Sequence, residues 1–219
     1  MSKDLISRGA VVTAESIFGA IAAESAPTLK VLLSSGISAN THRIPPSEDV
    51  LASQRKGGFP EGEVGWSPYH EQFPLFCAGA TRRAITRNEM VHVLLDHGAD
   101  PFAKFLTPIP ITYGHTAPDN FREAIVLHDL LYYGLAIDPF FQVPQLDIHR
   151  RDARGWTLLL AAFSGCPDSP LSWKQQEDST EEIATTFQKL LSMGADLEAL
   201  DNAGRNILHL MIRREEVTG

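Results

Sequence analysis

The sequence predicts an all-α fold made of paired short helices, and two observations carry this prediction. The first is apolar periodicity: in residues 88–98, NEMVHVLLDHG, apolar side chains recur every three or four positions, as on the buried face of a helix. The second is turn chemistry. In residues 190–209, LLSMGADLEALDNAGRNILH, Gly194 can end one helix in a left-handed conformation, and Asn206 can cap the next helix through its side-chain oxygen. The chain therefore reverses direction between two helices.

Composition and charge limit the classes of protein to which the chain can belong. Its 219 residues are 43% hydrophobic, which is enough for a core, and 19 Lys and Arg oppose 27 Asp and Glu, for a formal net charge of −8. This charge has the wrong sign for a general nucleic-acid or membrane-surface binder. Cys77 and Cys166 have no metal-ligand or redox spacing, the first residues lack the apolar region of a signal peptide, and the longest apolar run, 156–163, is too short to cross a bilayer. We expect a cytoplasmic or nuclear protein that binds neither nucleic acid nor membranes.

The turn residues resemble the junction between ankyrin repeats, in which G-A-D, a tight hairpin, D-x-x-G and T-P-L-H follow one another. The matching positions are Gly194, Ala195, Asp196, Asp201, Gly204, Asn206, Leu208 and His209. Two positions depart from the family, because Asn206 replaces Thr and Ile207 replaces Pro. Residues 98–100 repeat G-A-D, and residues 152–162, DARGWTLLLAA, repeat D-x-x-G-x-T. The resemblance implies an ankyrin-repeat solenoid of stacked helix-turn-helix units with loop insertions, similar to ankyrin proteins of fungi.

The resemblance also implies how the chain is divided. An N-terminal lead-in, 1–12, precedes one ankyrin-repeat domain, 13–219. The expected units are about 13–42, 67–105, 121–151, 152–200 and 201–219, and segments rich in proline, glycine or acidic residues predict loop insertions at about 43–66, 106–120 and 165–180.

Apolar residues at helical spacing are expected to face the core of each unit. In chain order they are Ile17, Ala20, Ile21, Leu29, Leu32 and Leu33; Leu75, Cys77, Ala78, Met90, Val91, Leu94 and Leu95; Leu127, Leu130 and Leu131; Ile183, Phe187, Leu190 and Leu191; and Ile207, Leu208 and Met211. Gly36, Gly98 and Gly194 are expected to end helices, and Thr157 to cap one.

The start of the second unit is open to two assignments. It begins at residues 73–78, FPLFCA, or at residues 65–70, GWSPYH, which also resembles the family motif. The first assignment needs less inserted loop, and we prefer it.

The third unit also has two possible assignments. In the first, helix resumes near Phe121 and a short second helix falls near residues 138–142. In the other, residues 130–139, LLYYGLAIDP, form the second helix of the pair. The first assignment is favoured because His128 and Leu160 are 32 residues apart, close to an ankyrin period of roughly 33 residues.

The sequence contains no constellation typical of catalysis or metal binding. The family uses histidines at the positions of His128 and His209 to bond the backbone of a neighbouring repeat. His92 and His97 are five residues apart, which does not place both on one helix face. Residues 149–152, HRRD, faintly resemble a kinase catalytic loop, but no Gly-rich loop or D-F-G accompanies them. We expect no catalysis, metal or cofactor; the alternatives are an enzyme with its site in the insertions, and a regulatory ankyrin segment of a larger multidomain protein.

The resemblance implies a protein–protein interaction module or scaffold that binds another protein through its hairpin tips and the inner face of its first helices. Carried over position by position, the expected partner-binding residues are Phe102, Lys104, Phe105, His149, Arg150, Arg151, Arg154, Trp156, Leu200 and Asn202. Aromatic and arginine side chains most often carry binding energy. Near the end of the chain, the apolar face would be formed by Ile207, Leu208, Met211 and Ile212, so we expect a C-terminal continuation of the array or self-association.

Overall fold

The computed structural model describes residues 11–43, 73–81, 83–108, 121–133, 138–164 and 176–210. In chain order, its elements are α2 (Ala14–Ala22), α3 (Ala26–Ser34), α5 (Pro74–Gly79), α6 (Ala84–Asp96), β1 (Lys104–Pro108), β2 (Phe121–Ile125), α7 (Val126–Tyr132), the 3-10 helix η1 (Asp138–Gln142), α8 (Leu158–Phe163) and α9 (Gln176–Ser192). Residues 207–210 are also helical.

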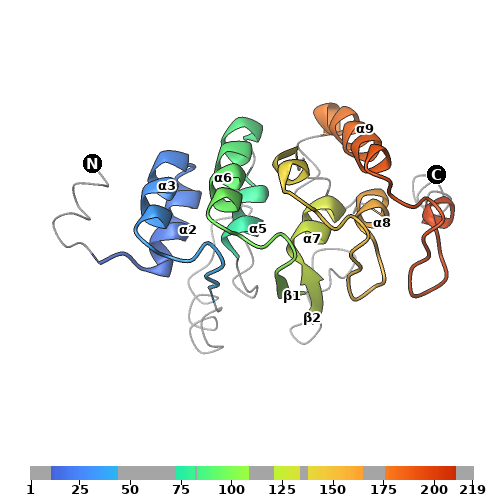
Figure 1. The fold of residues 1–219 in the computed structure, drawn as a ribbon, viewed down its shortest axis with the longest axis horizontal. Helices are drawn as coiled ribbons and strands as arrows, with labels where there is room; N and C mark the ends of the chain where they lie inside the picture. The colour runs from blue at the N-terminus through green and yellow to red at the C-terminus, as the bar shows by residue number, and fades with distance from the viewer. Residues whose placement is uncertain are drawn as a thin grey trace, which may run out of the picture.

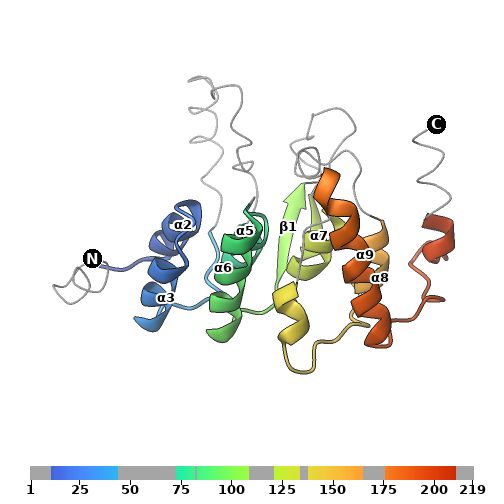
Figure 2. The same ribbon diagram turned by 90° about the horizontal axis from the view of Figure 1, so that it is seen from above.

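The helices form two layers that run along the molecule (Figures 1 and 2). One layer contains α2, α5, α7 and α8, and the other contains α3, α6, η1 and α9. Contacts join α2 to α3 and α5 to α6 within a pair, and they join α3 to α6, α5 to α7 and α7 to α8 between neighbours. Each pair therefore buries apolar surface against the next.

Glycines in the left-handed conformation end the second helix of three pairs, as predicted. The φ angles are +100° at Gly36, +80° at Gly98 and +92° at Gly194. After α6 and after α9, the N–H groups of this glycine and of the next alanine bond carbonyls of the last helical turn. Glycine takes this conformation without the steric strain of a Cβ.

The two predicted helix caps are also confirmed. Thr157 Oγ1 accepts a hydrogen bond from the N–H of Leu160 at 3.4 Å, and Asn206 Oδ1 accepts one from the N–H of His209 at 3.3 Å. Such caps satisfy N–H groups that have no partner within the first helical turn.

Most residues expected to face inward are buried. The confirmed set is Ile17, Ala20, Ile21, Leu29, Leu32, Leu33, Leu75, Ala78, Met90, Val91, Leu94, Leu127, Leu130, Leu131, Leu190 and Ile207, and Cys77, Leu95, Phe187 and Leu191 are partly buried against the same core. The prediction for Leu208 is wrong, because this side chain is 61% exposed while Ile207 and Leu210 are buried. Met211 and the side chain of Ile183 lie outside the described residues.

The predicted all-α fold is wrong, because β1 and β2 form a two-stranded antiparallel sheet. Lys104 lies opposite Ile125, and Pro108 lies opposite Phe121. The helix expected near Phe121 therefore begins only at Val126. The fold consists of helix pairs with a small sheet between the second and third pairs.

Burial of one face explains why these two segments are strands. Phe105 and Ala124 lie directly opposite each other and are 2% and 0% exposed. On the outer side, Lys104 and Glu123 form an ion pair at 2.9 Å. These two side chains are diagonal neighbours on the two strands, and opposite charges within such reach stabilise an antiparallel pair.

The predicted insertions lie mostly outside the described residues. This applies to residues 44–66, 109–120 and 165–175, and to the alternative start at 65–70. Where the chain is described, residues 106–108 belong to β1 and residues 176–180 to α9 rather than to loops. The helix η1 confirms the short helix predicted near residues 138–142.

In the part of the chain that the structure describes, no helix has both the length and the apolar character needed to span a membrane.

Candidate binding surface at two interlocked hairpins

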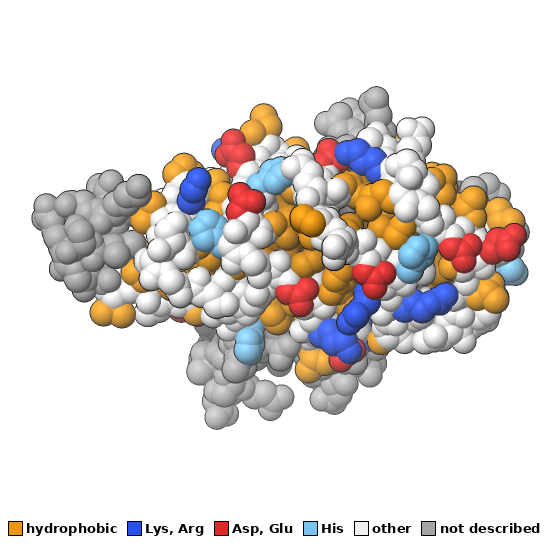
Figure 3. All heavy atoms as spheres, viewed as in Figure 1, with side chains coloured by type: hydrophobic (Ala, Val, Ile, Leu, Met, Phe, Trp, Pro, Cys, Tyr) orange, Lys and Arg blue, Asp and Glu red, His pale blue; other side chains and the backbone are white. Residues whose placement is uncertain are grey.

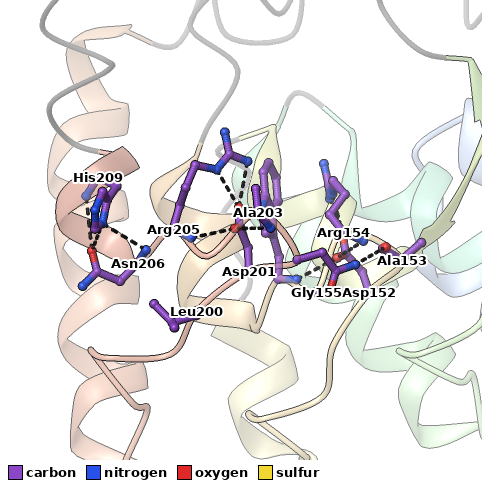
Figure 4. A network of polar contacts seen from close by, with 12 residues as sticks. Asp152, Ala153, Arg154, Gly155, Leu200, Asp201, Ala203, Arg205, Asn206 and His209 are labelled. Carbon is purple, nitrogen blue, oxygen red and sulfur yellow. Dashed lines mark hydrogen bonds and ion pairs between the residues drawn. The ribbon is translucent and has the colours of Figure 1, made fainter.

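Two hairpins, the Asp152 hairpin (residues 147–156) and the Asp201 hairpin (residues 196–205), are each organised by one buried aspartate (Figure 4). Asp152 Oδ1 accepts hydrogen bonds from the backbone N–H groups of Arg154 and Trp156, both at 2.9 Å. Asp201 Oδ1 accepts in the same way from the N–H groups two and four residues later, at 2.8 and 2.9 Å. An aspartate that bonds the backbone ahead of it stabilises a turn. Each hairpin is therefore held by bonds within five residues.

A guanidinium binds the second oxygen of each aspartate. Arg154 Nε and Nη2 both lie 2.6 Å from Asp152 Oδ2, and Arg205 Nε and Nη2 lie 2.9 and 2.7 Å from Asp201 Oδ2. Both carboxylates are only 1% exposed. Charge-assisted hydrogen bonds and ion pairs with arginine are among the strong polar contacts in proteins, and they offset the removal of these charges from water.

The two hairpins are bonded to each other. Asn202 donates its backbone N–H to the Arg154 carbonyl at 3.0 Å, and its Nδ2 to the Ala153 carbonyl at 2.9 Å. Arg151 Nη1 donates to the carbonyl of Gly155 at 2.8 Å and to that of Leu200. The hairpins therefore form one connected surface.

An asparagine also ties neighbouring turns near the other end of the row. Asn40 Nδ2 donates to the Gly98 carbonyl at 2.8 Å, and Asn40 Oδ1 accepts from the N–H of Asp100 at 2.7 Å. The sequence analysis assigned no such role to Asn40, because its partners are about sixty residues away along the chain.

A buried ionic cluster lies beneath the Asp152 hairpin. Asp129 in α7 is 0% exposed, and its Oδ1 lies 2.5 Å from Arg122 Nη2 and 3.8 Å from Arg154 Nη2. Burial raises the pKa of the Asp129 carboxyl, while the charges of Arg122 and Arg154 oppose this rise. This cluster connects β2, α7 and the Asp152 hairpin through charge.

Aromatic rings extend the cluster toward the Asp201 hairpin. The Arg154 guanidinium lies 5.1 Å from the ring centroid of Tyr132 and 3.7 Å from that of Trp156. The indole Nε1–H of Trp156 then donates to Asp201 Oδ2 at 3.3 Å. Cation–π contacts of this kind are stabilising, more so where they are shielded from water.

The hydrogen bonds on Asp201 change its titration. Desolvation works to raise the pKa of Asp201, but hydrogen bonds from Arg205, Trp156 and the Ala203 N–H outweigh it and lower the pKa to about 2. Hydrogen bonds to the charged form of a carboxylate favour that form. Asp201 is therefore ionised at neutral pH.

Five of the predicted partner-binding residues lie on the outer surface of the hairpins. His149, Arg150, Arg151, Leu200 and Asn202 are all exposed, and 49% of Leu200 is accessible to solvent. Their role in binding stays a prediction. The predicted Phe102 lies beside them and is partly buried, with the Arg150 guanidinium 5.8 Å from its ring centroid.

Four other residues predicted to bind a partner are buried, ion-paired or part of a strand, and so they do not lie exposed at a hairpin tip. Phe105 is buried in β1, with its ring centroid 5.0 Å from that of Phe76, because it lies on the inner face of the sheet. Trp156 is only 8% exposed because Arg154 stacks on it, and Arg154 itself is paired with Asp152. Lys104 is exposed, but it lies in a strand and pairs with Glu123.

Of the two histidines expected to bond the backbone of a neighbouring repeat, His128 instead bonds a carbonyl within its own expected unit, 121–151. His128 Nε2 lies 2.9 Å from the Arg150 carbonyl, so Nε2 carries the proton, since a carbonyl can only accept. Burial lowers the pKa of His128, which favours the neutral ring. The Nδ1 of His209 lies 2.6 Å from Asn206 Oδ1, within its own helical turn, and a bond from His209 to a neighbouring repeat stays a prediction.

Sequence reasoning missed Arg122 and Asp129, which carry the buried cluster. They are seven residues apart, on a strand and a helix, and a strand followed by a helix gives no simple periodicity that would pair them. In the described residues, no group of three or more His, Cys, Asp or Glu side chains could hold a metal ion.

Comparisons with known proteins add no further assignment. No protein-family model matches the chain, and no curated protein matches its sequence. The resemblance to ankyrin repeats therefore depends on the motifs in residues 98–100, 152–162 and 190–209.

Proposed function

We propose that this chain is a protein-interaction module of the ankyrin type, which binds another protein through the outer side chains of its hairpins and performs no catalysis. The observation that carries the proposal is the bonding between the Asp152 and Asp201 hairpins through Asn202 and Arg151. Loops that are not fixed lose conformational entropy on binding, which weakens an interface. Hairpins that are already fixed to each other avoid much of this loss.

The exposed residue types support the same proposal. Arg150, Arg151 and Leu200 are exposed on the bonded hairpins, and the Arg150 guanidinium lies over the ring of Phe102. Arginine and aromatic residues are enriched among the residues that dominate protein–protein binding energy. A surface that combines them on a fixed backbone suits a protein partner.

We further propose a cytoplasmic or nuclear location. The chain has two cysteines, and Cys77 is a free thiol. Free thiols are typical of reducing compartments.

Affinity capture with matched variants tests the proposed function. The full chain and two double variants would be used as bait in extracts of the source cell, with captured proteins quantified by mass spectrometry. One variant, Arg150→Ser with Leu200→Ser, removes a basic and an apolar side chain from the hairpins. The control, Lys30→Ser with Ile85→Ser, removes the same two types from exposed positions on α3 and α6.

The proposal expects at least one protein that the wild type and the control capture equally and that the hairpin variant captures at least tenfold less. It is overturned if every protein captured by the wild type is captured equally by the hairpin variant, or if both variants lose capture alike. Circular dichroism of the three baits would verify that they are equally folded.

A further inference from the structure

Arg150 and Arg151 differ from the other arginines around the two hairpins. Arg122, Arg154 and Arg205 each bind an aspartate. Among the described residues, neither Arg150 nor Arg151 forms an ion pair: Arg150 contacts the Phe102 ring, and Arg151 donates to the carbonyls of Leu200 and Gly155. Two adjacent, exposed guanidiniums thus keep their positive charge uncompensated.

The backbone that carries these two side chains is fixed. The Arg150 carbonyl accepts a hydrogen bond from the buried His128 at 2.9 Å, and the Arg150 N–H donates to the Asp147 carbonyl at 3.2 Å. The guanidinium of Arg151 is held by two carbonyls. A ligand therefore meets guanidiniums that are largely oriented before binding, which lowers the entropy lost on association.

The two guanidiniums point to opposite sides of the Asp152 hairpin. Arg150 reaches the ring of Phe102, in the turn that follows α6, and Arg151 reaches Leu200, in the Asp201 hairpin. A single phosphate is bound best where several donors converge on one point. Diverging guanidiniums fit two separate anions, and two carboxylates along an extended peptide provide them.

Each guanidinium has an apolar neighbour. Phe102 lies against Arg150, and the exposed Leu200 supplies the carbonyl that Arg151 binds. The surface therefore alternates basic and apolar groups along the row of hairpins. Figure 3 shows Lys and Arg side chains gathered below the middle of this face, at the level where Figure 1 shows the strands and hairpins, with apolar and acidic side chains close by.

The net negative charge of the chain further restricts the class of partner that can bind. With 27 acidic against 19 basic residues, the protein repels a long polyanion such as duplex DNA over most of its surface. A short acidic segment can approach Arg150 and Arg151 alone. Repulsion elsewhere then directs the segment to this site.

We propose that the site formed by Phe102, Arg150, Arg151 and Leu200 binds an extended acidic peptide segment of a partner protein, with two carboxylates separated by an apolar residue. The carboxylates pair with the two guanidiniums, and apolar side chains contact Phe102 and Leu200. This inference rests on the proposed function, because it names the chemistry of the partner that the hairpins bind.

Selection from a random peptide-display library tests the inference. The immobilised full chain is the target, and the most enriched peptides are synthesised with a fluorescent label for anisotropy titrations. The test variant is Arg150→Gln with Arg151→Gln, because glutamine removes the two positive charges and keeps a polar side chain at each position. The control, Lys30→Gln with Arg83→Gln, removes two positive charges from exposed side chains on and beside the helices.

The wild type is expected to select peptides in which Asp or Glu alternate with apolar residues. Their affinity should fall at least tenfold for the Arg150 and Arg151 variant and stay within twofold for the control. Raising the salt concentration from 50 to 300 mM should weaken binding at least fivefold, because the contacts are ionic and exposed. Replacing Asp and Glu of the peptide by Asn and Gln should abolish detectable binding.

Circular dichroism and thermal melting establish that each variant is folded. If the double variant is not, Arg150→Gln alone replaces it, since the exposed Arg150 guanidinium lies over the Phe102 ring and, among the described residues, forms no ion pair. Selected peptides without acidic residues, or with equal affinity for the test variant, overturn the inference and leave the proposed function standing. Tighter binding of a duplex DNA oligomer than of the selected peptides overturns it as well. Failure to enrich any peptide also overturns the inference. The proposed function is overturned as well only if affinity capture gives no partner that depends on the hairpins.

Discussion

The Asp152 and Asp201 hairpins have the same internal bonds but different surroundings. In each, the aspartate bonds the N–H groups two and four residues later, and a glycine three residues later has a positive φ of +77° at Gly155 and +72° at Gly204. The arginine differs in position: it is two residues after the aspartate in the first hairpin and four residues after it in the second. Trp156 occupies in the first hairpin the position that Arg205 has in the second.

The surroundings decide how deeply equivalent residues are buried. Seven residues after the aspartate, Leu159 is 1% exposed whereas Leu208 is 61% exposed. The helix α8 that contains Leu159 packs between α7 and α9, and among the described residues no helix follows residues 207–210. Leu159 and Leu208 occupy equivalent positions in the sequence of the two hairpins, but we expect them to contribute differently to stability.

The largest loss of stability is expected at Asp129, the buried carboxylate that lies beneath the Asp152 hairpin. Asp129→Ala removes the buried carboxylate and leaves Arg122 and Arg154 without it. Breaking a buried ion pair in this way lowers the free energy of unfolding by about 3–5 kcal/mol. Urea unfolding followed by tryptophan fluorescence measures this loss.

The matched control for Asp129 is Asp138→Ala. Asp138 forms an ion pair with Lys189, and both side chains are substantially exposed. Exposed pairs contribute less than about 1 kcal/mol. Equal losses for the two variants would contradict a special role of the buried cluster.

The next comparison concerns Leu159 and Leu208. Leu159→Ala should lower the free energy of unfolding by about 2–5 kcal/mol, because it removes a fully buried side chain. Leu208→Ala should lower it by less than about 0.5 kcal/mol, because that side chain is exposed. Denaturant unfolding of both variants checks the contrast, and a large loss for Leu208→Ala would mean that it packs against a neighbour.

A smaller difference is expected between the two glycines. A Cβ on Gly155 would lie 2.4 Å from Asn202 Oδ1 and 2.8 Å from its backbone nitrogen, whereas a Cβ on Gly204 would meet nothing within 4 Å. Gly204→Ala should lose about 1–2 kcal/mol from the left-handed conformation alone, and Gly155→Ala about 1–3 kcal/mol more from the clash. Thermal melting of both variants measures the difference, and equal losses would show that the two hairpins are not tightly bonded.

The last comparison concerns the pH dependence that Asp201 contributes. Its pKa is lowered from 3.8 to about 2 in the folded protein, so the stabilisation is complete above pH 3.8 and is lost as the pH falls through 2. The shift corresponds to about 2 kcal/mol. The difference in unfolding free energy between the wild type and Asp201→Asn should shrink by about this amount from pH 6 to pH 2, and a constant difference would contradict the pKa shift.

Features whose bonding partners are near in the chain could be predicted from the amino-acid sequence. Gly98 and Gly194 end helices, Thr157 and Asn206 cap them, and the Asp–Gly turns follow from groups at most four residues apart. The periodicity of the helices likewise predicts their buried faces, because each turn repeats the same geometry. The exposure of Arg150 and Leu200 follows from their place in such turns.

Features whose partners are distant in the chain could not be predicted in this way, because they depend on contacts made in the folded protein. Strand β1 depends on pairing with β2, which begins thirteen residues later, and so the segment containing Phe105 is not a hairpin tip. The burial of Trp156 depends on Arg154 and Asp201, and the exposure of Leu208 depends on which elements surround it. Burial and strand pairing are properties of neighbours brought together by the fold, and no local pattern of residues specifies which neighbours those are.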